Sequence, residues 1–513
     1  MLSIYNRIYT YYQKKQTQRF LVLLAIILPL IPILYALSKG YIALWYDPAR
    51  DLLEASNNLH KLTLIGPTSG IPGIFYGPYW IWLLSFGLIF SKNPVFVILI
   101  TATIPYFILF PLLWFRFTRF FGFTATTLGW LFFIMSTGKI YASALWNPYS
   151  APLFALGVIY LLIISNLSKV TKRQLLISTV IGLLLGLTLN FHISFGIAFT
   201  FGVFLYVAID GIMNVLKNKK HTKQILRTRF IYLLLTLLGL GFTFIPTLIF
   251  EWRHGFHQMQ TLIQTLTQYG VVISIKGLSQ QEIAQSFFET FAKILSLPNH
   301  WGLFLILFLV SIFAILVKVR KITLNNDDKK ILTILSCIIF GIVSIYLTAK
   351  NPVWAYHFIS VDIIFLLLIT FILSKIKLLN AFAFLWIVVV LFNTYHIFFQ
   401  VSKHTSLEEY NTKKAAVISI SQDANNQNYS VYAYTPSIYN YDYSYLFQWL
   451  TQKNVPYDPS ENTHTKLVYI IVPIQKNALI TDFINYRGSE KEYRTEKIWQ
   501  IESTLSIIKK VTK

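Results

Sequence analysis

Three carboxylates and an arginine share one short segment of the chain, WYDPARDLLEA, which supplies Asp47, Arg50, Asp51 and Glu54. The first 400 residues contain only ten acidic residues, so three within eight positions is a marked concentration. A carboxylate can act as a general base toward a hydroxyl, and a guanidinium can stabilise charge on a phosphate. The alternative is structural, with Asp47 as the N-cap of a helix that starts at the following proline and the other charges in surface pairs.

Polar residues beside aromatic ones recur in four later segments. These are SALWNPYS (143–150), NFHIS (190–194), FEWRHGFHQ (250–258) and KNPVWAYHF (350–358). The candidate substrate-binding residues are Arg50, Glu54, Tyr76, Trp146, Asn147, His192, Glu251, Arg253, His254, Tyr356 and His357. Taken singly, each of the later residues is also explained as an interfacial anchor or a helix cap. A shared location on one face of the protein would favour a binding site.

The sequence lacks the residue spacing of several common sites. No HxxxH or HExxH pair is present for zinc, and neither GxSxG, GxxxxGK[ST] nor GxGxxG occurs. Carboxylates suit a divalent metal ion, but no spacing identifies its ligands, so a divalent metal cofactor is left open and its ligands are unknown. Cys337 is the only cysteine. It excludes an intrachain disulfide and a cysteine-based zinc site.

Composition places these residues in an α-helical polytopic membrane protein. Of the 513 residues, 55% are hydrophobic, 17% are aromatic and only 13% are charged, whereas soluble domains carry about 25% charged residues. Apolar runs of about 17–25 residues predict eleven transmembrane helices, and the shorter run 79–91 predicts a helix at the membrane interface. The predicted spans are 20–38, 94–115, 121–137, 151–167, 174–190, 193–209, 230–250, 301–317, 331–349, 356–373 and 378–399.

The distribution of lysine and arginine predicts the orientation. With a cytoplasmic N-terminus, 22 basic residues before residue 400 fall on the inner side of the cell membrane and nine on the outer side, as the positive-inside rule requires. The net charge of +23 is therefore largely a topology signal. Because the basic residues are dispersed over short loops, we expect no nucleic-acid partner. This orientation puts the carboxylate segment and the four polar segments together on the extracytoplasmic face.

Two regions differ from the transmembrane spans. Residues 39–93 form a long first extracytoplasmic loop, with interfacial helices and a stretch rich in Gly and Pro that lets backbone approach a ligand. After a transmembrane domain over 1–400, residues 401–513 hold 11 of the 21 acidic residues and predict a small extracytoplasmic α/β domain. Its expected strands are 415–421, 429–435 and 465–473, and its expected helices are 437–454 and 496–510.

Together these features resemble the GT-C superfamily of membrane glycosyltransferases, and within it the protein O-mannosyltransferase and aminoarabinose-transferase-like branch (glycosyltransferase family 39/83-like). The resemblance covers residues 15–400. It is carried by YDPARDLLEA (46–55), GPTSGIPGIFYGPYWIWLL (66–84), SALWNPYSAP (143–152), TLNFH (188–192) and FEWRHGF (250–256). It implies a GT-C fold and transfer of a hexosyl or pentosyl sugar, with inversion, from a polyprenyl-phosphate-linked donor to a lipid, glycan or protein acceptor. Membrane lipids are the other expected partners.

The resemblance puts the family's acidic position on Asp47 and leaves Asp51 as a second carboxylate, so the base is one of these two residues. A guanidinium binds phosphate in a fork geometry, and on this resemblance Arg253, with His254 or His192, faces the donor phosphate. The alternative class is a transporter or flippase of lipid-linked glycans. That class would place ionisable residues inside the spans, where only Asp362 clearly qualifies.

Overall fold

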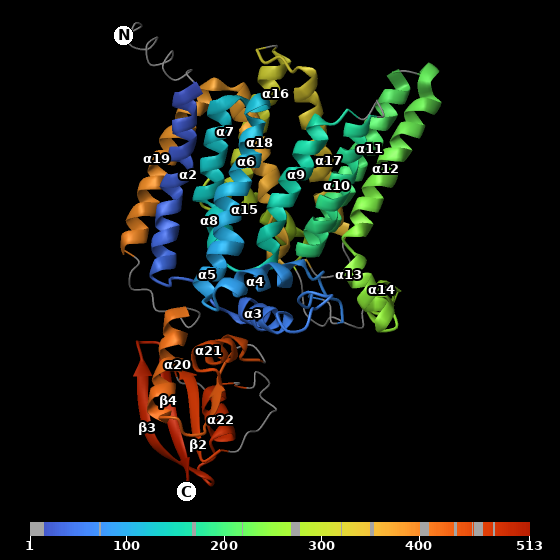
Figure 1. Ribbon diagram of the computed structural model, residues 1–513. Helices are drawn as coiled ribbons and strands as arrows, with labels where there is room; N and C mark the ends of the chain where they lie inside the picture. The colour runs from blue at the N-terminus through green and yellow to red at the C-terminus, as the bar shows by residue number, and fades with distance from the viewer. Residues whose placement is uncertain are drawn as a thin grey trace.

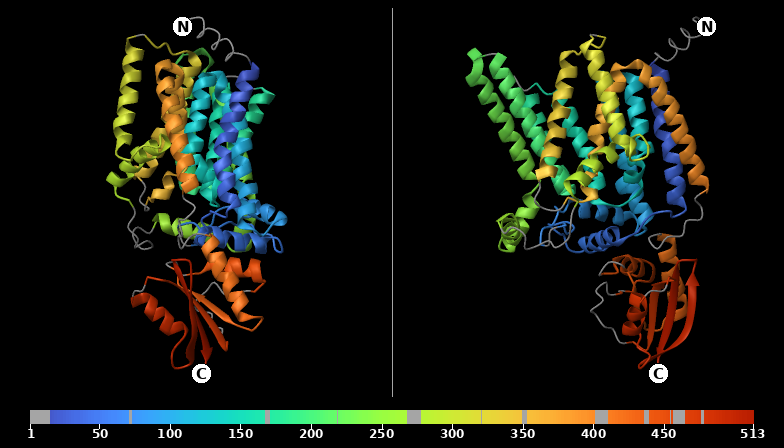
Figure 2. Two further views of the ribbon diagram at one scale, coloured as in Figure 1. Left: turned by 90° about the vertical axis from the view of Figure 1, so that its left-hand side faces the viewer. Right: turned by 180° about the vertical axis from the view of Figure 1, so that it is seen from behind.

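The computed structural model describes residues 15–513 apart from 71–72, 167–170, 218, 268–277, 320, 349–352, 401–409, 436–438, 454, 456–464 and 476–477. A helical bundle makes up most of the chain, and a small domain with a β-sheet lies beyond one end of it (Figures 1 and 2). Helix α2 (Lys15–Ser38) begins at the opposite end of the bundle from the sheet domain. The predicted fold, an α-helical membrane bundle with a C-terminal α/β domain, is confirmed.

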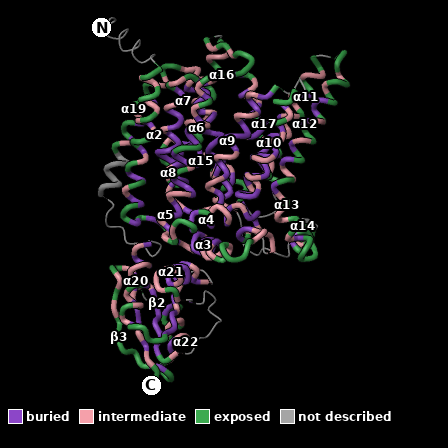
Figure 3. Tube along the Cα trace, viewed as in Figure 1, coloured by how far each residue is buried: buried purple, intermediate pink, exposed green. Residues whose placement is uncertain are grey.

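Nine helical stretches in the described residues are long and apolar enough to cross a membrane. They are α2, Pro94–Met135 (α5 to α7), Asn147–Ile164 (η4 and α9), α10 (Lys172–Phe191), α11 (Ile193–Lys217), Lys219–Phe242 (η5 and α12), α16 (Trp301–Lys318), α17 (Asn326–Thr348) and Ala355–Lys375 (η6 and α18). Burial is concentrated in the bundle interior (Figure 3). Outer helices expose large apolar side chains such as Phe230 and Phe304, which suits contact with acyl chains.

The stretch Pro94–Met135 turns back on itself and contains two antiparallel arms. The Trp114 indole donates to the Thr126 carbonyl (2.8 Å), and the Thr103 hydroxyl donates to the Ala142 carbonyl (2.7 Å). The nine stretches become ten when the two arms are counted separately, and α19 (Lys377–Gln400) brings the number to eleven. The described helices thus match the eleven predicted spans. The pieces of the hairpin are α5 (Pro94–Ile98), η1 (Leu99–Thr103), η2 (Pro105–Leu109), α6 (Phe110–Trp114), η3 (Phe115–Phe117), α7 (Thr118–Met135) and α8 (Thr137–Ser143).

Several helices lie at the end of the bundle that faces the sheet domain. They are α3 (Tyr46–Asn58), α4 (Tyr79–Phe90), α13 (Ile245–Arg253) and α14 (His257–Thr267) (Figure 1). With 12 residues, α4 extends only about 18 Å at 1.5 Å per residue, well short of a hydrocarbon core of about 30 Å. The Ser85 hydroxyl on α4 donates to the Ala55 carbonyl on α3 (2.9 Å), which joins the two helices. Inside the bundle, α15 (Gln280–Ile294) packs on α16 and α18 (Asp362–Lys375).

The C-terminal domain has a four-stranded sheet with the order β1-β2-β4-β3. β1 (Ser430–Ala433) pairs in parallel with β2 (Leu467–Pro473), and β4 (Leu505–Thr512) pairs antiparallel with both β2 and β3 (Tyr493–Ile501). Neighbouring residues of β2 point to opposite faces. Tyr469 joins the core that includes α20 (Tyr410–Ala424) and α21 (Tyr441–Thr451), whereas Ile470 joins a smaller core with α22 (Ala478–Arg487).

Two of the elements predicted for this domain are wrong. Residues 415–421 are not a strand but part of α20, because the buried residues Ala416, Ile420 and Ala424 recur at helical spacing. Residues 496–510 are not a helix but most of the β3–β4 hairpin, in which β3 is an edge strand with a mostly exposed surface. The strands predicted at 429–435 and 465–473 and the helix predicted at 437–454 are confirmed as β1, β2 and α21.

Candidate active site

Helix α3 carries the carboxylate segment at the end of the bundle nearest the sheet domain. The helix begins at Tyr46, and Trp45 occupies the N-cap position without a side-chain hydrogen bond. The N-cap role predicted for Asp47 is therefore wrong, since Asp47 lies in the first helical turn. Proline is tolerated in that turn because the first N–H groups of a helix have no intrahelical partner. The carboxylate of Asp47 also interacts favourably with the positive end of the helix dipole.

Arg50 connects the two aspartates of α3. Its Nη1 lies 3.0 Å from Oδ1 of Asp47, and its Nε and Nη2 donate to Oδ1 of Asp51 at 2.9 and 2.7 Å. The second oxygen of Asp51 accepts a hydrogen bond from the Trp80 indole (2.8 Å). Asp51 is completely buried, whereas the side chain of Asp47 is 30% exposed. The buried Asp51 thus fixes the position of Arg50, and the partly exposed Asp47 is the aspartate that a substrate can reach.

The buried position of α3 shifts the pKa values of its charged groups. Burial raises the pKa of Asp51 to about 6, although the adjacent Arg50 guanidinium opposes the shift. Burial and the charge of Asp51 raise the pKa of Glu54 to about 7. Burial would lower the pKa of Arg50, but Asp51 and Asp47 outweigh this effect and raise it. The segment therefore combines a fixed cation with two carboxyl groups that bind protons unusually well.

Aromatic residues from separate parts of the chain line one side of Asp47. The ring of Trp146 lies 6.1 Å from that of Trp45 and 5.9 Å from that of Tyr356, measured between centroids. Tyr356 interacts electrostatically with Asp47. Tyr76 is buried, which raises the pKa of its hydroxyl; Tyr356 adds to the shift and a hydrogen bond with Asn147 opposes it. The structure therefore brings together Asp47, Tyr76, Trp146, Asn147 and Tyr356.

The loop that delivers Tyr76 is packed too closely for side chains at two glycines. A Cβ atom at Gly77 would lie 1.7 Å from Oδ1 of Asn190, and a Cβ atom at Gly66 would lie 2.2 Å from the Gly77 carbonyl oxygen. In the same loop, the Thr68 hydroxyl accepts a hydrogen bond from Nη1 of Arg50 (3.3 Å). The Gly-rich stretch thus brings its backbone against the bundle and supports the Arg50 guanidinium.

Two of the predicted histidines lie buried in the same part of the molecule. His192, between α10 and α11, is completely buried, and neither ring nitrogen has a hydrogen-bond partner among the described residues. It interacts electrostatically with His357. The Nδ1 atom of His357 accepts a hydrogen bond from the Trp354 amide (3.2 Å), and the ring packs against Tyr356 (4.3 Å between centroids). His357 therefore adjoins the aromatic side of the site, with His192 behind it.

The FEWRHGFHQ segment contacts the Gly-rich loop that carries Tyr76, where Oε1 of Gln258 accepts a hydrogen bond from the Phe75 amide (2.8 Å). Glu251 is buried, and one of its oxygens accepts a hydrogen bond from the Met259 amide (3.0 Å). Arg253 and His254 are exposed at the end of α13, where His254 stacks on Phe250 with 4.0 Å between ring centroids. In the described part of the chain, no contact joins Arg253 or His254 to the group around Asp47. Their role at the donor phosphate stays a prediction.

Sequence reasoning missed two residues that hold the site together. Thr68 and Trp80 bind the Arg50–Asp51 pair, but neither is ionisable and both lie far from it in sequence. A buried tryptophan needs an acceptor for its indole N–H. The YWIWLL run after the Gly-rich loop therefore contained a weak signal for a buried acceptor such as Asp51.

The described residues contain no large cluster of candidate metal ligands. No group of three or more His, Cys, Asp or Glu residues in the described part of the chain could hold a metal ion. Both oxygens of Asp51 already accept hydrogen bonds from Arg50 and Trp80, and a guanidinium beside Asp47 disfavours a second cation there. The arrangement suits proton transfer at Asp47 next to a fixed positive charge.

The chain shares its overall fold with two solved structures of ArnT, which confirms the predicted GT-C type of architecture. The chain is similar to ArnT from Cupriavidus metallidurans in the apo state, with 9% identity, a TM-score of 0.60 and coverage of 95% of this chain and 97% of ArnT. For ArnT bound to undecaprenyl phosphate the identity is 10% and the TM-score 0.58, with the same coverage. The Archaeoglobus fulgidus oligosaccharyltransferase complex with Zn and sulfate gives 13% identity and a TM-score of 0.49, over 95% and 72% of the two chains. No protein-family model and no curated protein matches the chain.

Proposed function

We propose that the protein is a membrane glycosyltransferase that moves a hexosyl or pentosyl sugar from a polyprenyl-phosphate-linked donor to a lipid, glycan or protein acceptor. The observation that carries the proposal is the partly exposed Asp47 carboxylate, held by Arg50, which is itself fixed by the buried Asp51. This group lies at the end of a GT-C bundle, where a lipid-linked donor can enter from the membrane. The crystal structure of ArnT with undecaprenyl phosphate, a protein with the same fold, supports the choice of donor.

In the proposed reaction the acceptor hydroxyl attacks the anomeric carbon of the donor sugar. A new C–O bond forms, the bond from the anomeric carbon to the phosphate oxygen breaks, and its electron pair leaves with the polyprenyl phosphate. Asp47 takes the proton of the attacking hydroxyl. This single displacement inverts the configuration at the anomeric carbon.

Other residues have supporting roles in this proposal. Asp51 and Trp80 keep Arg50 in place, so that Arg50 both orients Asp47 and supplies positive charge. The aromatic residues Trp146 and Tyr356 offer flat surfaces beside Asp47 for a sugar ring. The exposed Arg253 is the proposed phosphate contact from α13.

The proposed orientation follows from the basic loops. The turns between α6 and α7, between α11 and α12 and between α16 and α17 lie at the end of the bundle opposite the sheet domain (Figure 1). Their sequences include Arg116, Lys220 and Lys321. By the positive-inside rule that end is cytoplasmic. The N-terminus is then cytoplasmic, and α3 and the domain over 401–513 are extracytoplasmic at the cell membrane.

A transfer assay with purified protein tests the proposal. The protein, reconstituted in sealed lipid vesicles, is incubated with a panel of polyprenyl-phosphate hexoses and pentoses and with crude envelope lipid, glycan and protein acceptors. We expect release of polyprenyl phosphate and labelling of one acceptor class. A well-folded protein that only moves the donors across a bilayer, without breaking the sugar–phosphate bond, would contradict the proposal and support a flippase.

A further inference from the structure

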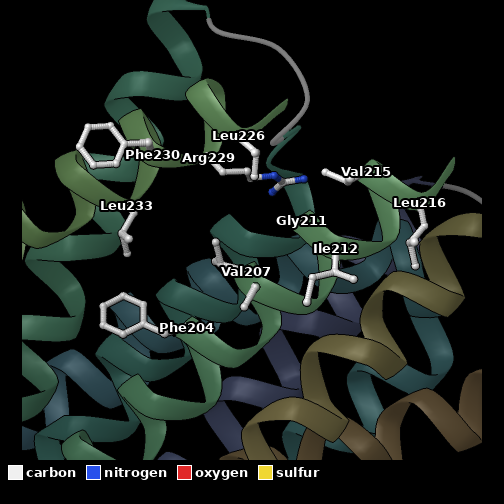
Figure 4. A pocket seen from close by; sticks show the side chains of 11 residues that line it. Phe204, Val207, Gly211, Ile212, Val215, Leu216, Leu226, Arg229, Phe230 and Leu233 are labelled. Carbon is white, nitrogen blue, oxygen red and sulfur yellow. The ribbon is translucent and has the colours of Figure 1, made fainter. Parts of the chain in front are cut away.

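At the end of the bundle away from α3, an apolar groove lies between helices α11 and α12 (Figure 4). The groove has a volume of about 610 Å³. Its walls come from both helices and include Phe204, Val207, Gly211, Ile212, Phe230 and Leu233. A groove of this size, open between two outer helices, suits an acyl chain.

A polar cavity of about 390 Å³ adjoins the apolar groove. The two share one lining residue, Arg229, whose guanidinium extends toward the space between α11 and α12 (Figure 4). The other lining residues of the polar cavity include Arg119, Ser165, Asp210, Asn214, Asp327 and Lys330. An apolar groove that leads into a polar cavity matches the two parts of a membrane lipid.

Arg229 is buried but only partly satisfied. It is 8% exposed, and its Nη2 pairs with Asp210 on α11. Its Nε and Nη1 are buried without a hydrogen-bond partner among the described residues. A buried charged donor without an acceptor is costly. The oxygens of a phosphate group are suitable acceptors, because guanidinium and phosphate form parallel charge-assisted hydrogen bonds.

The charge around the cavity favours an anion. Arg119, Arg229 and Lys330 face it, against Asp210 and Asp327. The turn between α11 and α12 adds further exposed basic residues, which are Lys217, Lys219, Lys220, Lys223 and Arg227. Basic pockets between membrane helices are typical sites for anionic lipid head groups.

We propose that the groove and the polar cavity together bind an anionic glycerophospholipid of the surrounding leaflet. The acyl chain occupies the groove between α11 and α12, and the phosphate lies at Arg229. The site is at the opposite end of the bundle from Asp47, so it is separate from the proposed sugar-transfer site. The inference does not depend on the proposed transfer reaction.

Four variants separate the parts of this proposal. Gly211→Leu fills the groove, because a Cβ atom at Gly211 meets only the aliphatic part of Arg229 at 3.8 Å. Its matched control is Gly241→Leu on α12, where a Cβ atom meets nothing within 4 Å. Arg229→Gln combined with Asp210→Asn removes the cation together with its carboxylate partner, so that neither charge is left unpaired. Lys223→Gln removes one exposed charge from the same turn and tests for non-specific attraction.

Native mass spectrometry of the delipidated full-length protein, with phosphatidylglycerol or phosphatidylcholine of identical chains, measures the lipid that is retained. We expect the wild type and the Gly241 and Lys223 variants to retain phosphatidylglycerol at least about tenfold better than phosphatidylcholine. Gly211→Leu and the Arg229/Asp210 double variant should lose this preference while keeping the wild-type melting temperature. Equal retention of the two lipids by the wild type would overturn the proposal. Wild-type retention by Gly211→Leu would also overturn it, and this variant decides the question if the double variant does not fold.

Discussion

Replacing Asp51 by asparagine should destabilise the protein by about 3–5 kcal/mol, the usual cost of breaking a buried ion pair. Asp51 is completely buried and accepts two hydrogen bonds from Arg50 and one from Trp80. An asparagine can keep one oxygen toward Arg50, but its amide nitrogen then faces the Trp80 indole N–H. Two donors would oppose each other in a site without solvent, and Arg50 would lose half of its anionic partners.

A double-mutant cycle with Trp80→Phe isolates this conflict. Trp80→Phe alone removes one hydrogen bond to a charged acceptor, worth about 1.5–3 kcal/mol. In the Asp51→Asn background the same change removes the opposing donor, so it should cost less. We therefore expect the double variant to be more stable than the sum of the two single variants, by about 0.5–3 kcal/mol.

The stability of these variants is measured by reversible unfolding in mixed detergent micelles. Asp482→Asn is the matched control, since Asp482 is exposed on α22 in the C-terminal domain. Sugar transfer by Asp51→Asn should fall as well, because Arg50 no longer holds Asp47 in place. A loss of less than about 1 kcal/mol for Asp51→Asn, below the range for a buried pair, or strictly additive effects in the cycle, would refute the role given to Asp51.

Three further predictions concern the C-terminal domain, α3 and α13. Lys413→Met should loosen the contact between the C-terminal domain and the start of α3 and slow sugar transfer, because Lys413 is buried and donates to the Leu44 carbonyl (2.6 Å) and to Asp442 (2.7 Å). Limited proteolysis checks this prediction. The control Lys497→Met breaks an exposed ion pair and should have little effect. In the folded protein the pKa of Glu54 is raised from 4.5 to about 7. Between pH 4.5 and about 7 the folded state therefore retains a proton that the unfolded state loses, and the free energy of unfolding falls as the pH rises. Glu54→Gln should make the melting temperature less dependent on pH there, and an unchanged profile would contradict the assignment. Arg253→Gln should weaken binding of the lipid-phosphate donor in a direct binding assay, and wild-type affinity would remove Arg253 from the site.

The features predicted correctly from the sequence are those that depend on short stretches of chain. Apolar runs of spanning length identified the helices of the bundle, including the hairpin arms on either side of Gly122. The spacing of Asp47, Arg50 and Asp51 put their side chains within reach of one another on one helix.

The features that the sequence did not predict depend on tertiary packing. The alternation in 415–421 is typical of a strand, but contacts with the sheet and with α21 select a helix at this position. Most residues of β3 are exposed, so its sequence has no regular spacing of buried apolar residues that would distinguish a strand from a helix. Trp80 meets Asp51 across 29 residues of sequence, and no local pattern specifies that contact.

The transfer rate of Asp47→Asn tests the central claim most directly. Asparagine keeps the size of the side chain and can still accept a hydrogen bond from Arg50, but it cannot act as a base. We expect turnover from the polyprenyl-phosphate sugar to fall by about 10²–10⁴-fold, with the melting temperature and donor affinity close to those of the wild type and with Asp482→Asn fully active. Near wild-type turnover for Asp47→Asn, or a larger loss of turnover in Asp51→Asn at equal folded fraction, would contradict the assignment of Asp47 as the base.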